Sequence, residues 1–148
     1  MKILFYDTKS YDREFFEKLL PSYPGIEIKF IEANIHEETA ALAHGYDAIC
    51  AFVNADLGAP VIEELHRQGV KLILMRCAGY NNVDLETAAR CEIQVARVPG
   101  YSPEAVAEHA MALALTANRH THKAYIKCRE NNFALNGLMG VNFYQKTA

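Results

Sequence analysis

The chain has 148 residues, 51% of them hydrophobic and 22% charged, and its 15 Lys and Arg against 18 Asp and Glu give a net charge of -3. This balance is typical of a globular domain and excludes a disordered tail, a collagen-like repeat and a disulfide-stapled miniprotein. No basic run favours nucleic acid as a partner, and no stretch approaches the roughly 18 apolar residues of a membrane span. We therefore expect a cytoplasmic protein that binds neither nucleic acid nor membrane.

The first hundred residues alternate between short apolar runs and helical patterns. The patterns predict strands at 3–6, 26–31, 48–53, 72–75 and 94–98, and helices at 11–20, 37–43, 60–68 and 85–89. Apolar and charged residues alternate over 26–31, which is typical of a strand at the edge of a sheet. Five strands separated by helices predict an α/β domain over residues 1–100, with a parallel sheet, helices on both faces and a flavodoxin-like strand order.

A different pattern begins at residue 101. Ser102 is predicted to cap a helix that has Pro103 in its first turn and that extends to about Lys127. Residues 105–117 are almost wholly apolar, and a helix that is apolar around most of its circumference must be buried on most sides. The five-stranded domain is too small to bury all of it. We therefore expect residues 101–148 to begin a second domain.

The cysteines and histidines do not form a metal or redox motif. No two cysteines have C-x-x-C spacing, so we expect four reduced thiols, at Cys50, Cys77, Cys91 and Cys128. His120 and His122 do not share a helix face, which makes them a poor metal pair, and we expect no metal site. His109 lies within the apolar helical pattern, and we interpret it as a structural residue rather than an acid or base.

Ligands of doubly wound sheets bind beyond the carboxyl ends of the strands. The first strand end lacks the glycine of a flavin phosphate loop, and Pro99-Gly100 stands where a phospho-receiver would need a lysine. After the fourth strand, Ala78-Gly79 leaves backbone N–H groups uncovered by bulky side chains. Such amides can bind a small anion such as a carboxylate. A tight turn without a ligand is the alternative interpretation.

Two long runs carry a family resemblance: residues 76–84, RCAGYNNVD, and residues 98–110, VPGYSPEAVAEHA. Both closely resemble D-isomer-specific 2-hydroxyacid dehydrogenases, and within them the fermentative NAD-dependent D-lactate dehydrogenases. The likeness spans nearly the whole chain. It implies a flavodoxin-like substrate domain, the first helix of a Rossmann-type NAD domain, and a homodimeric parent enzyme that reduces pyruvate to D-lactate with NADH.

The resemblance also implies which parts of such an enzyme these 148 residues lack. In the family, a G-x-G-x-x-G loop for the NAD pyrophosphate follows almost directly after the equivalent of Lys146-Thr147-Ala148. The family's catalytic Arg, Glu and His also lie downstream and have no counterparts here. We thus expect an N-terminal part, truncated before the glycine-rich loop and inactive by itself. Alternatives are a dehydrogenase for branched or aromatic 2-oxoacids, and a stand-alone flavodoxin-like binding or regulatory module.

Site residues follow from the resemblance, position by position. Ala78 and Gly79 match the turn whose amides hold the substrate carboxylate. Phe52 matches a side chain that borders the variable group of the substrate, and Tyr101 matches a hinge tyrosine that contacts the substrate. Val106 matches an apolar position near the bound nicotinamide and is the one cofactor-binding residue expected here. For Phe52, Tyr101 and Val106 a packing role is the alternative.

Overall fold

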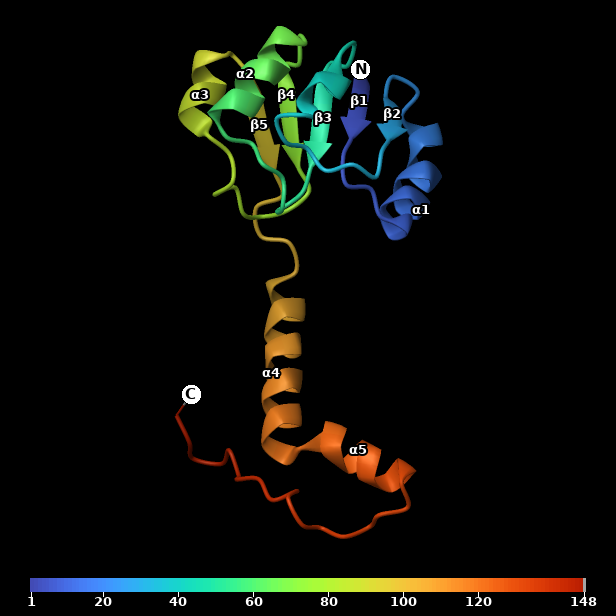
Figure 1. Ribbon diagram of the computed structural model, residues 1–148, viewed down its shortest axis with the longest axis vertical. Coiled ribbons are helices and arrows are strands. Elements are labelled where there is room, and N and C mark those ends of the chain that lie inside the picture. Colours follow the sequence, from blue (N-terminus) through green and yellow to red (C-terminus); the bar gives the residue numbers. More distant parts are fainter. Residues whose placement is uncertain (148) are drawn as a thin grey trace. The chain divides into compact units, whose positions relative to one another are not determined.

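The computed structural model describes residues 1–147, which divide into two compact units, one of Met1–Tyr101 and one that starts at Ser102. The first unit contains the strands β1 (Lys2–Phe5), β2 (Glu27–Phe30), β3 (Ala48–Ala51), β4 (Leu72–Met75) and β5 (Gln94–Arg97). Neighbouring strands are parallel, and their order is β2-β1-β3-β4-β5 (Figure 1). The flavodoxin-like order is therefore confirmed, and β2 occupies an edge as its alternating pattern predicts.

The helices of the first unit connect these strands. They are α1 (Ser10–Leu19), α2 (Ala59–Arg67) and α3 (Leu85–Arg90), with 3₁₀ turns η1 (Leu20–Ser22) and η2 (Ala40–Ala43). The helix predicted over 37–43 is wrong, because only the short turn η2 forms there. The Thr39 hydroxyl accepts the N–H of His36 at 3.0 Å and donates to the carbonyl of Asn34 at 2.7 Å. Such local bonds compete with the helical hydrogen-bond ladder.

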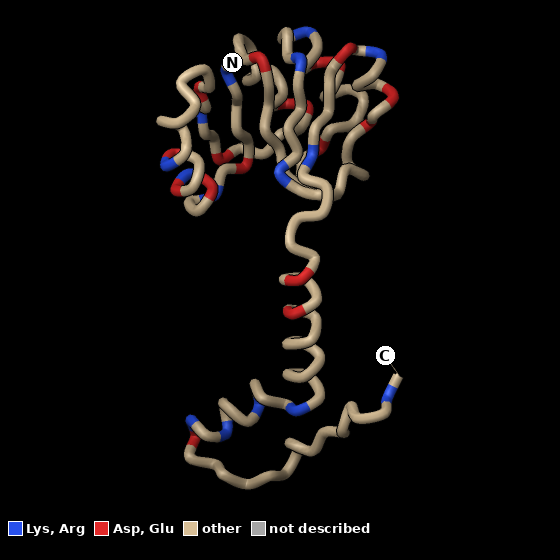
Figure 2. Tube along the Cα trace, turned by 180° about the vertical axis from the view of Figure 1, so that it is seen from behind, with Lys and Arg blue, Asp and Glu red and all other residues tan. Residues whose placement is uncertain are grey.

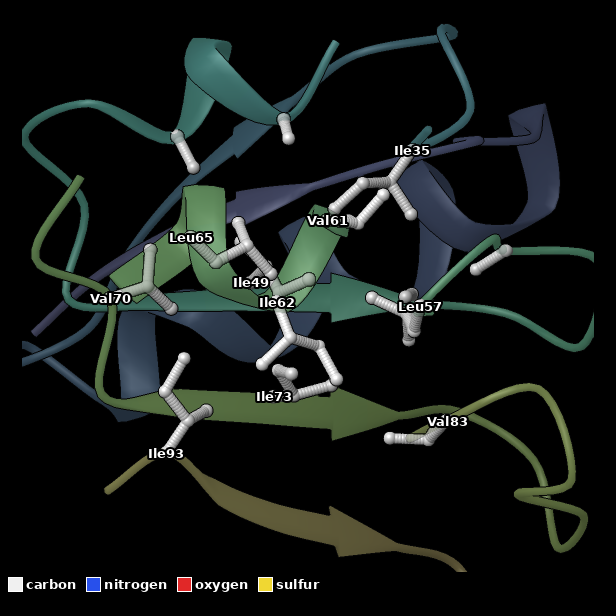
Figure 3. Close-up of a cluster of buried hydrophobic side chains, with 14 of the residues drawn as sticks. Ile35, Ile49, Leu57, Val61, Ile62, Leu65, Val70, Ile73, Val83 and Ile93 are labelled. Carbon is white, nitrogen blue, oxygen red and sulfur yellow. The ribbon is translucent and has the colours of Figure 1, made fainter. Parts of the chain in front are cut away.

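The larger apolar core lies between one face of the sheet and helices α2 and α3. Alternate strand residues such as Ile49 and Ile73 point to this face, where they meet Val61, Ile62 and Leu65 of α2 (Figure 3). Each of these side chains is fully buried. Since burial of such a side chain contributes roughly 1.5–3 kcal/mol, this layer holds the central strands in place.

The opposite face of the sheet is covered by α1. The ring of Phe5 packs against Phe16 of α1 and Phe30 of β2, with centroid separations of 5.0 and 5.3 Å. Further along this face, Leu72 and Leu74 of β4 are only half-buried. Helices thus lie on both faces, as predicted, and α1 packs mainly on the β1 side of the second face.

The second unit begins with two helices rather than one. They are α4 (Pro103–Arg119) and α5 (Thr121–Arg129), separated by His120, whose φ of 51° is left-handed. The single helix predicted to reach Lys127 is therefore wrong, since a residue in this conformation ends an α-helix. Figure 2 shows acidic residues near the start of α4 and a basic residue, Arg119, at its end, which complements the helix dipole.

Ser102 occupies the predicted cap position, directly before Pro103 at the start of α4, but it does not cap the helix with its side chain. Ser102 has a φ of 43°, and its side chain makes no capping hydrogen bond. A capping side chain requires an extended backbone at the cap residue, and the left-handed conformation directs the hydroxyl elsewhere.

The segment that follows α5 is attached to α4 through Asn118. The Asn118 amide donates to the carbonyl of Val141 at 2.7 Å and accepts the N–H of Val141 at 2.9 Å. A Cβ at the neighbouring Gly140 would clash with the backbone of Asn118, so this close approach requires glycine. No side chain of α4 is fully buried. Among the helices of residues 1–147, none is long and apolar enough to cross a membrane.

Candidate functional site

The candidate site lies at the carboxyl ends of β3 and β4. Phe52 follows β3, and Ala78 and Gly79 lie three and four residues beyond the end of β4. Asn82 joins the two loops, because its side-chain N–H donates to the carbonyl of Ala55 at 2.8 Å and to that of Phe52 at 3.4 Å. The structure thereby brings Phe52, Ala78 and Gly79 to one edge of the sheet, where ligands of such folds bind.

Successive carbonyl groups of the Ala78-Gly79 turn are held by the protein itself. The carbonyl of Cys77 accepts the N–H of Val98 at 3.2 Å, and that of Gly79 accepts the thiol of Cys77 at 3.2 Å. Between them, the carbonyl of Ala78 accepts the Arg97 guanidinium at 2.9 Å. In a trans peptide the C=O and the following N–H point in opposite directions. The N–H groups that follow each of these carbonyls are therefore directed away from those partners.

The N–H groups of Ala78 and Gly79 are available to a ligand. Within residues 1–147, neither of them donates to a backbone carbonyl or to a side chain. A Cβ built on Gly79 would meet no atom within 4 Å, so the space beside the turn is open. Adjacent backbone N–H groups without internal partners form an anion-binding concavity. The turn is therefore suited to a small carboxylate.

The side chain of Arg76 joins the strand ends at this edge of the sheet. Its side chain is only 12% exposed, and it donates to the carbonyls of Tyr6 at 3.0 Å and Asp7 at 2.7 Å. The carboxylates of Asp12 and Asp7 lie 3.6 and 3.9 Å from the guanidinium. The same guanidinium lies 4.8 Å from the ring centroid of Phe52. Phe52 therefore rests on a cation whose charge is already balanced.

The cysteines of this region are neutral thiols. Burial raises the pKa of Cys50 to about 11, against the smaller opposing effect of Arg76. Burial also raises the pKa of Cys77, so this thiol keeps the proton that it donates to Gly79 at neutral pH. All four cysteines are free, as predicted. In the part of the chain that the structure describes, no group of His, Cys, Asp and Glu could hold a metal ion.

The two remaining predicted residues lie outside this turn. Tyr101 is the last residue of the first unit and is 58% exposed. It follows Gly100, whose φ of +107° only glycine adopts readily. Val106 belongs to the second unit, on the first part of α4, with a side chain that is 65% exposed. Neither side chain is buried in an apolar core.

Comparison with known proteins identifies the family. The model of the catalytic domain of D-isomer specific 2-hydroxyacid dehydrogenases matches residues 3–147. This chain belongs to that family. The D-lactate dehydrogenase of Escherichia coli is 48% identical over 148 residues, which are 100% of this chain and 45% of that protein. A D-lactate dehydrogenase of Curvularia clavata is 49% identical over 150 residues, covering 99% of this chain and 43% of that protein.

Solved structures of the 2-hydroxyacid dehydrogenase family share this fold. The apo structure of the Escherichia coli D-lactate dehydrogenase superposes with a TM-score of 0.85 over 95% of this chain and 44% of that one, at 48% identity. A D-2-hydroxyisocaproate dehydrogenase gives 0.80 over 98% and 44%, at 25% identity. The predicted family and fold are thus confirmed. The chain spans less than half the length of the relatives it matches.

The sequence patterns did not indicate three polar side chains of the candidate site: Arg76, Asn82 and Arg97. Arg76 and Asn82 stand in the run that carries the family resemblance, where the local pattern indicates no more than a turn residue at Asn82. Arg97 ends β5 and lies just before the second run. An available signal was a charged residue directly at the carboxyl end of an apolar strand, which places its head group at the ligand-binding edge.

Proposed function

We propose that this chain forms the substrate-binding part of an NAD-dependent dehydrogenase that reduces pyruvate, or a similar 2-oxoacid, to the D-2-hydroxyacid. The main support for this proposal is the Ala78-Gly79 turn. Its carbonyls accept hydrogen bonds, while its N–H groups have no acceptor within residues 1–147. Membership of the 2-hydroxyacid dehydrogenase family supports a 2-oxoacid as the anion. In this proposal residues 1–100 form the substrate domain, and residues 101–148 form the hinge and the start of the NAD-binding domain of a homodimer.

The chain's own residues bind and orient the 2-oxoacid. The N–H groups of Ala78 and Gly79 donate to the substrate carboxylate and so fix one end of the molecule. Phe52 lies at the neighbouring strand end and borders the substituent at the other end. The charge of Arg76 does not compete for the carboxylate, because Asp7 and Asp12 already face it. Tyr101 contacts the substrate from the hinge.

The residues present are insufficient to hold NAD by themselves. The cofactor would supply the hydride, while protein groups supply orientation and charge. Val106 is the one residue assigned near the nicotinamide, and its exposed apolar side chain can contact a ring but cannot bind a pyrophosphate. The 148 residues contain no G-x-G-x-x-G sequence. The residues assigned here therefore bind and orient the substrate and do not themselves transfer the hydride.

A chimera tests the proposed function. This chain would replace the matching 148 residues of the Escherichia coli D-lactate dehydrogenase, and pyruvate reduction would be followed at the NADH absorbance. Gly79→Ala is expected to fold normally, because nothing lies within 4 Å of the added Cβ, yet to obstruct the carboxylate. We expect kcat/KM for pyruvate to fall about 10- to 150-fold, the value of a hydrogen bond to a charged group.

Gly25→Ala is the matched control, since a Cβ at Gly25 also meets nothing within 4 Å. It should leave kcat/KM unchanged. Equal activity of the Gly79→Ala chimera and the parent chimera would contradict the proposed carboxylate turn.

The 148-residue chain by itself is expected to show no NADH-dependent pyruvate reduction, because the residues assigned to it bind substrate and include no acid/base group. The purified chain, supplied with NADH and pyruvate, would be assayed beside the active chimera. Steady turnover by the chain alone would show that its residues include catalytic groups that we have not assigned.

A further inference from the structure

We propose that Arg97 is a positioning residue for the substrate: its guanidinium fixes the Ala78–Gly79 peptide so that the N–H of Gly79 is aimed at the carboxylate. This inference rests on the proposed function, because it explains how the carboxylate turn is held. Arg97 ends β5, one strand away from the turn in the sheet. Its Nη1 donates to the carbonyl of Ala78 at 2.9 Å.

The bond acts on Gly79 through the geometry of the peptide. The carbonyl of Ala78 and the N–H of Gly79 belong to the same planar trans unit and point in opposite directions. A donor that holds the carbonyl therefore also sets the direction of the N–H. Backbone bonding alone holds the preceding peptide, since the N–H of Val98 donates to the carbonyl of Cys77 at 3.2 Å. The Ala78–Gly79 peptide depends on a side chain.

The guanidinium is held in place by stacking. Its central carbon lies 5.0 Å from the centroid of the Tyr80 ring, which follows Gly79 directly in the chain. Arginine can stack its plane on an aromatic ring while one N–H donates sideways, a combination that the ammonium group of lysine cannot reproduce. Arg97 thus contacts both sides of Gly79, through Ala78 before it and Tyr80 after it.

The charge of Arg97 is not neutralised by an ion pair. Among the described residues, Arg13, Arg67, Arg76 and Arg90 each face a carboxylate within 4.0 Å, whereas Arg97 takes part in no such pair. A cation on the carbonyl side of a peptide withdraws electron density from it and strengthens its N–H as a donor. Position and charge therefore both favour an anion on the Gly79 side.

The test is a titration of the ¹⁵N-labelled 148-residue chain with sodium pyruvate at constant ionic strength, followed by the amide resonances of Ala78 and Gly79. We expect saturable shifts of both resonances in the unsubstituted chain. Arg97→Met should raise the dissociation constant about three- to tenfold, and should move the Gly79 resonance even before pyruvate is added. Because Arg97 is exposed, the rest of the amide spectrum should stay unchanged.

Two further variants separate positioning from charge. Arg97→Lys keeps the charge but loses the planar group, so it should recover only part of the affinity and leave the ligand-free Gly79 resonance displaced. Arg90→Met removes one positive charge from an exposed arginine at the end of α3, where it pairs with Glu63, and should leave the affinity unchanged.

The outcomes distinguish the two proposals. Unshifted Ala78 and Gly79 resonances in the unsubstituted chain would contradict the proposed carboxylate site itself. Normal shifts there with an equal dissociation constant in Arg97→Met would overturn only the role of Arg97. Full recovery by Arg97→Lys, or equal weakening by Arg90→Met, would show that overall charge acts and not position.

Discussion

Arg76, directly after β4, organises the carboxyl edge of the sheet because it contacts residues at the ends of two other strands. It donates to the carbonyls of Tyr6 and Asp7 after β1, and its guanidinium faces Phe52 after β3. Asp7, which is held by this arginine, has a left-handed φ of 50°, a conformation that costs free energy unless its surroundings enforce it. The candidate site is therefore built on a buried ionic cluster.

Substitution of Arg76 is expected to destabilise the first unit strongly. Arg76→Met would leave the buried carboxylate of Asp12 without its cation and Asp7 with Lys9 alone, and breaking a buried pair in this way costs about 3–5 kcal/mol. The free energy of unfolding would be measured by urea denaturation with circular dichroism. Arg90→Met, at an exposed ion pair, is the control and should change it by less than about 1 kcal/mol. Similar losses in the two variants would contradict the role of the cluster.

Phe52 is expected to limit the size of the substrate. In the chimera, Phe52→Ala should favour branched 2-oxoacids over pyruvate by about 10- to 200-fold in the ratio of kcat/KM, as a hydrophobic pocket discriminates by ~1–3 kcal/mol. Steady-state kinetics with pyruvate and a branched 2-oxoacid measure the ratio. Val53→Ala, the exposed neighbour, is the control and should leave it unchanged. An unchanged ratio in Phe52→Ala would assign Phe52 to packing alone.

At the scale of elements, the short helix α3 depends on its cap. The Asp84 carboxylate accepts the N–H of Thr87 at 2.9 Å and so caps the helix. This hydrogen bond lowers the pKa of Asp84 below its ordinary value of 3.8. The cap residue also lies two positions beyond Asn82, which joins the loops of the site. The capped start of α3 thus helps to fix the loop that follows β4.

The pH dependence of this cap follows from the direction of the shift. A lowered pKa means that the carboxylate stabilises the folded state fully above pH 3.8, and that this contribution is lost as the pH falls through the lower, folded-state pKa. Asp84→Ala should lower the melting temperature at pH 7 and lose less stability than the parent upon acidification. Asp84→Asn, which keeps the acceptor, should show a smaller loss at pH 7. Parallel melting curves of all three chains between pH 7 and pH 3 would contradict the cap.

The second unit exposes large apolar side chains around the circumference of α4. They are Val106, Met111, Leu113 and Leu115. Each exposed side chain of this size forgoes roughly 1.5–3 kcal/mol of burial, and so much exposed apolar surface on one helix is uncommon on a monomer. We therefore expect the 148-residue chain to associate with itself through α4, while the first unit stays folded.

Light scattering and hydrogen exchange test this expectation. The molar mass measured by light scattering should exceed that of one chain, and Leu113→Glu should lower it toward the mass of the monomer. Thr121→Glu adds the same charge on α5 and serves as the control; it should leave the measured mass unchanged. A monodisperse monomer whose amides over 105–117 are as protected as those of β3 (Ala48–Ala51) would contradict the prediction.

The amino-acid sequence was enough to predict the α/β class, the five strands, the edge position of β2 and the family. These properties follow from local periodicity and from contiguous motifs, so a short segment of the sequence is enough to predict them. It also placed Phe52, Ala78 and Gly79 at strand ends, which in a parallel sheet share one edge. The 37–43 helix and the continuous helix beyond Arg119 failed, because Thr39 and His120 adopt local conformations that a hydrophobic pattern does not encode.

The contacts that hold the candidate site together could not be predicted from the sequence, because they join residues far apart in the chain. Arg76 bonds to a carbonyl 70 residues away, Asn82 to one 27 residues away and Arg97 to one 19 residues away. No local pattern specifies such partners, because the sheet order and not the chain order makes these strand ends neighbours. The direction of the N–H groups of Ala78 and Gly79 is likewise a tertiary property, since the carbonyls of the same two peptides accept hydrogen bonds from Val98 and Arg97, at the end of the adjacent strand.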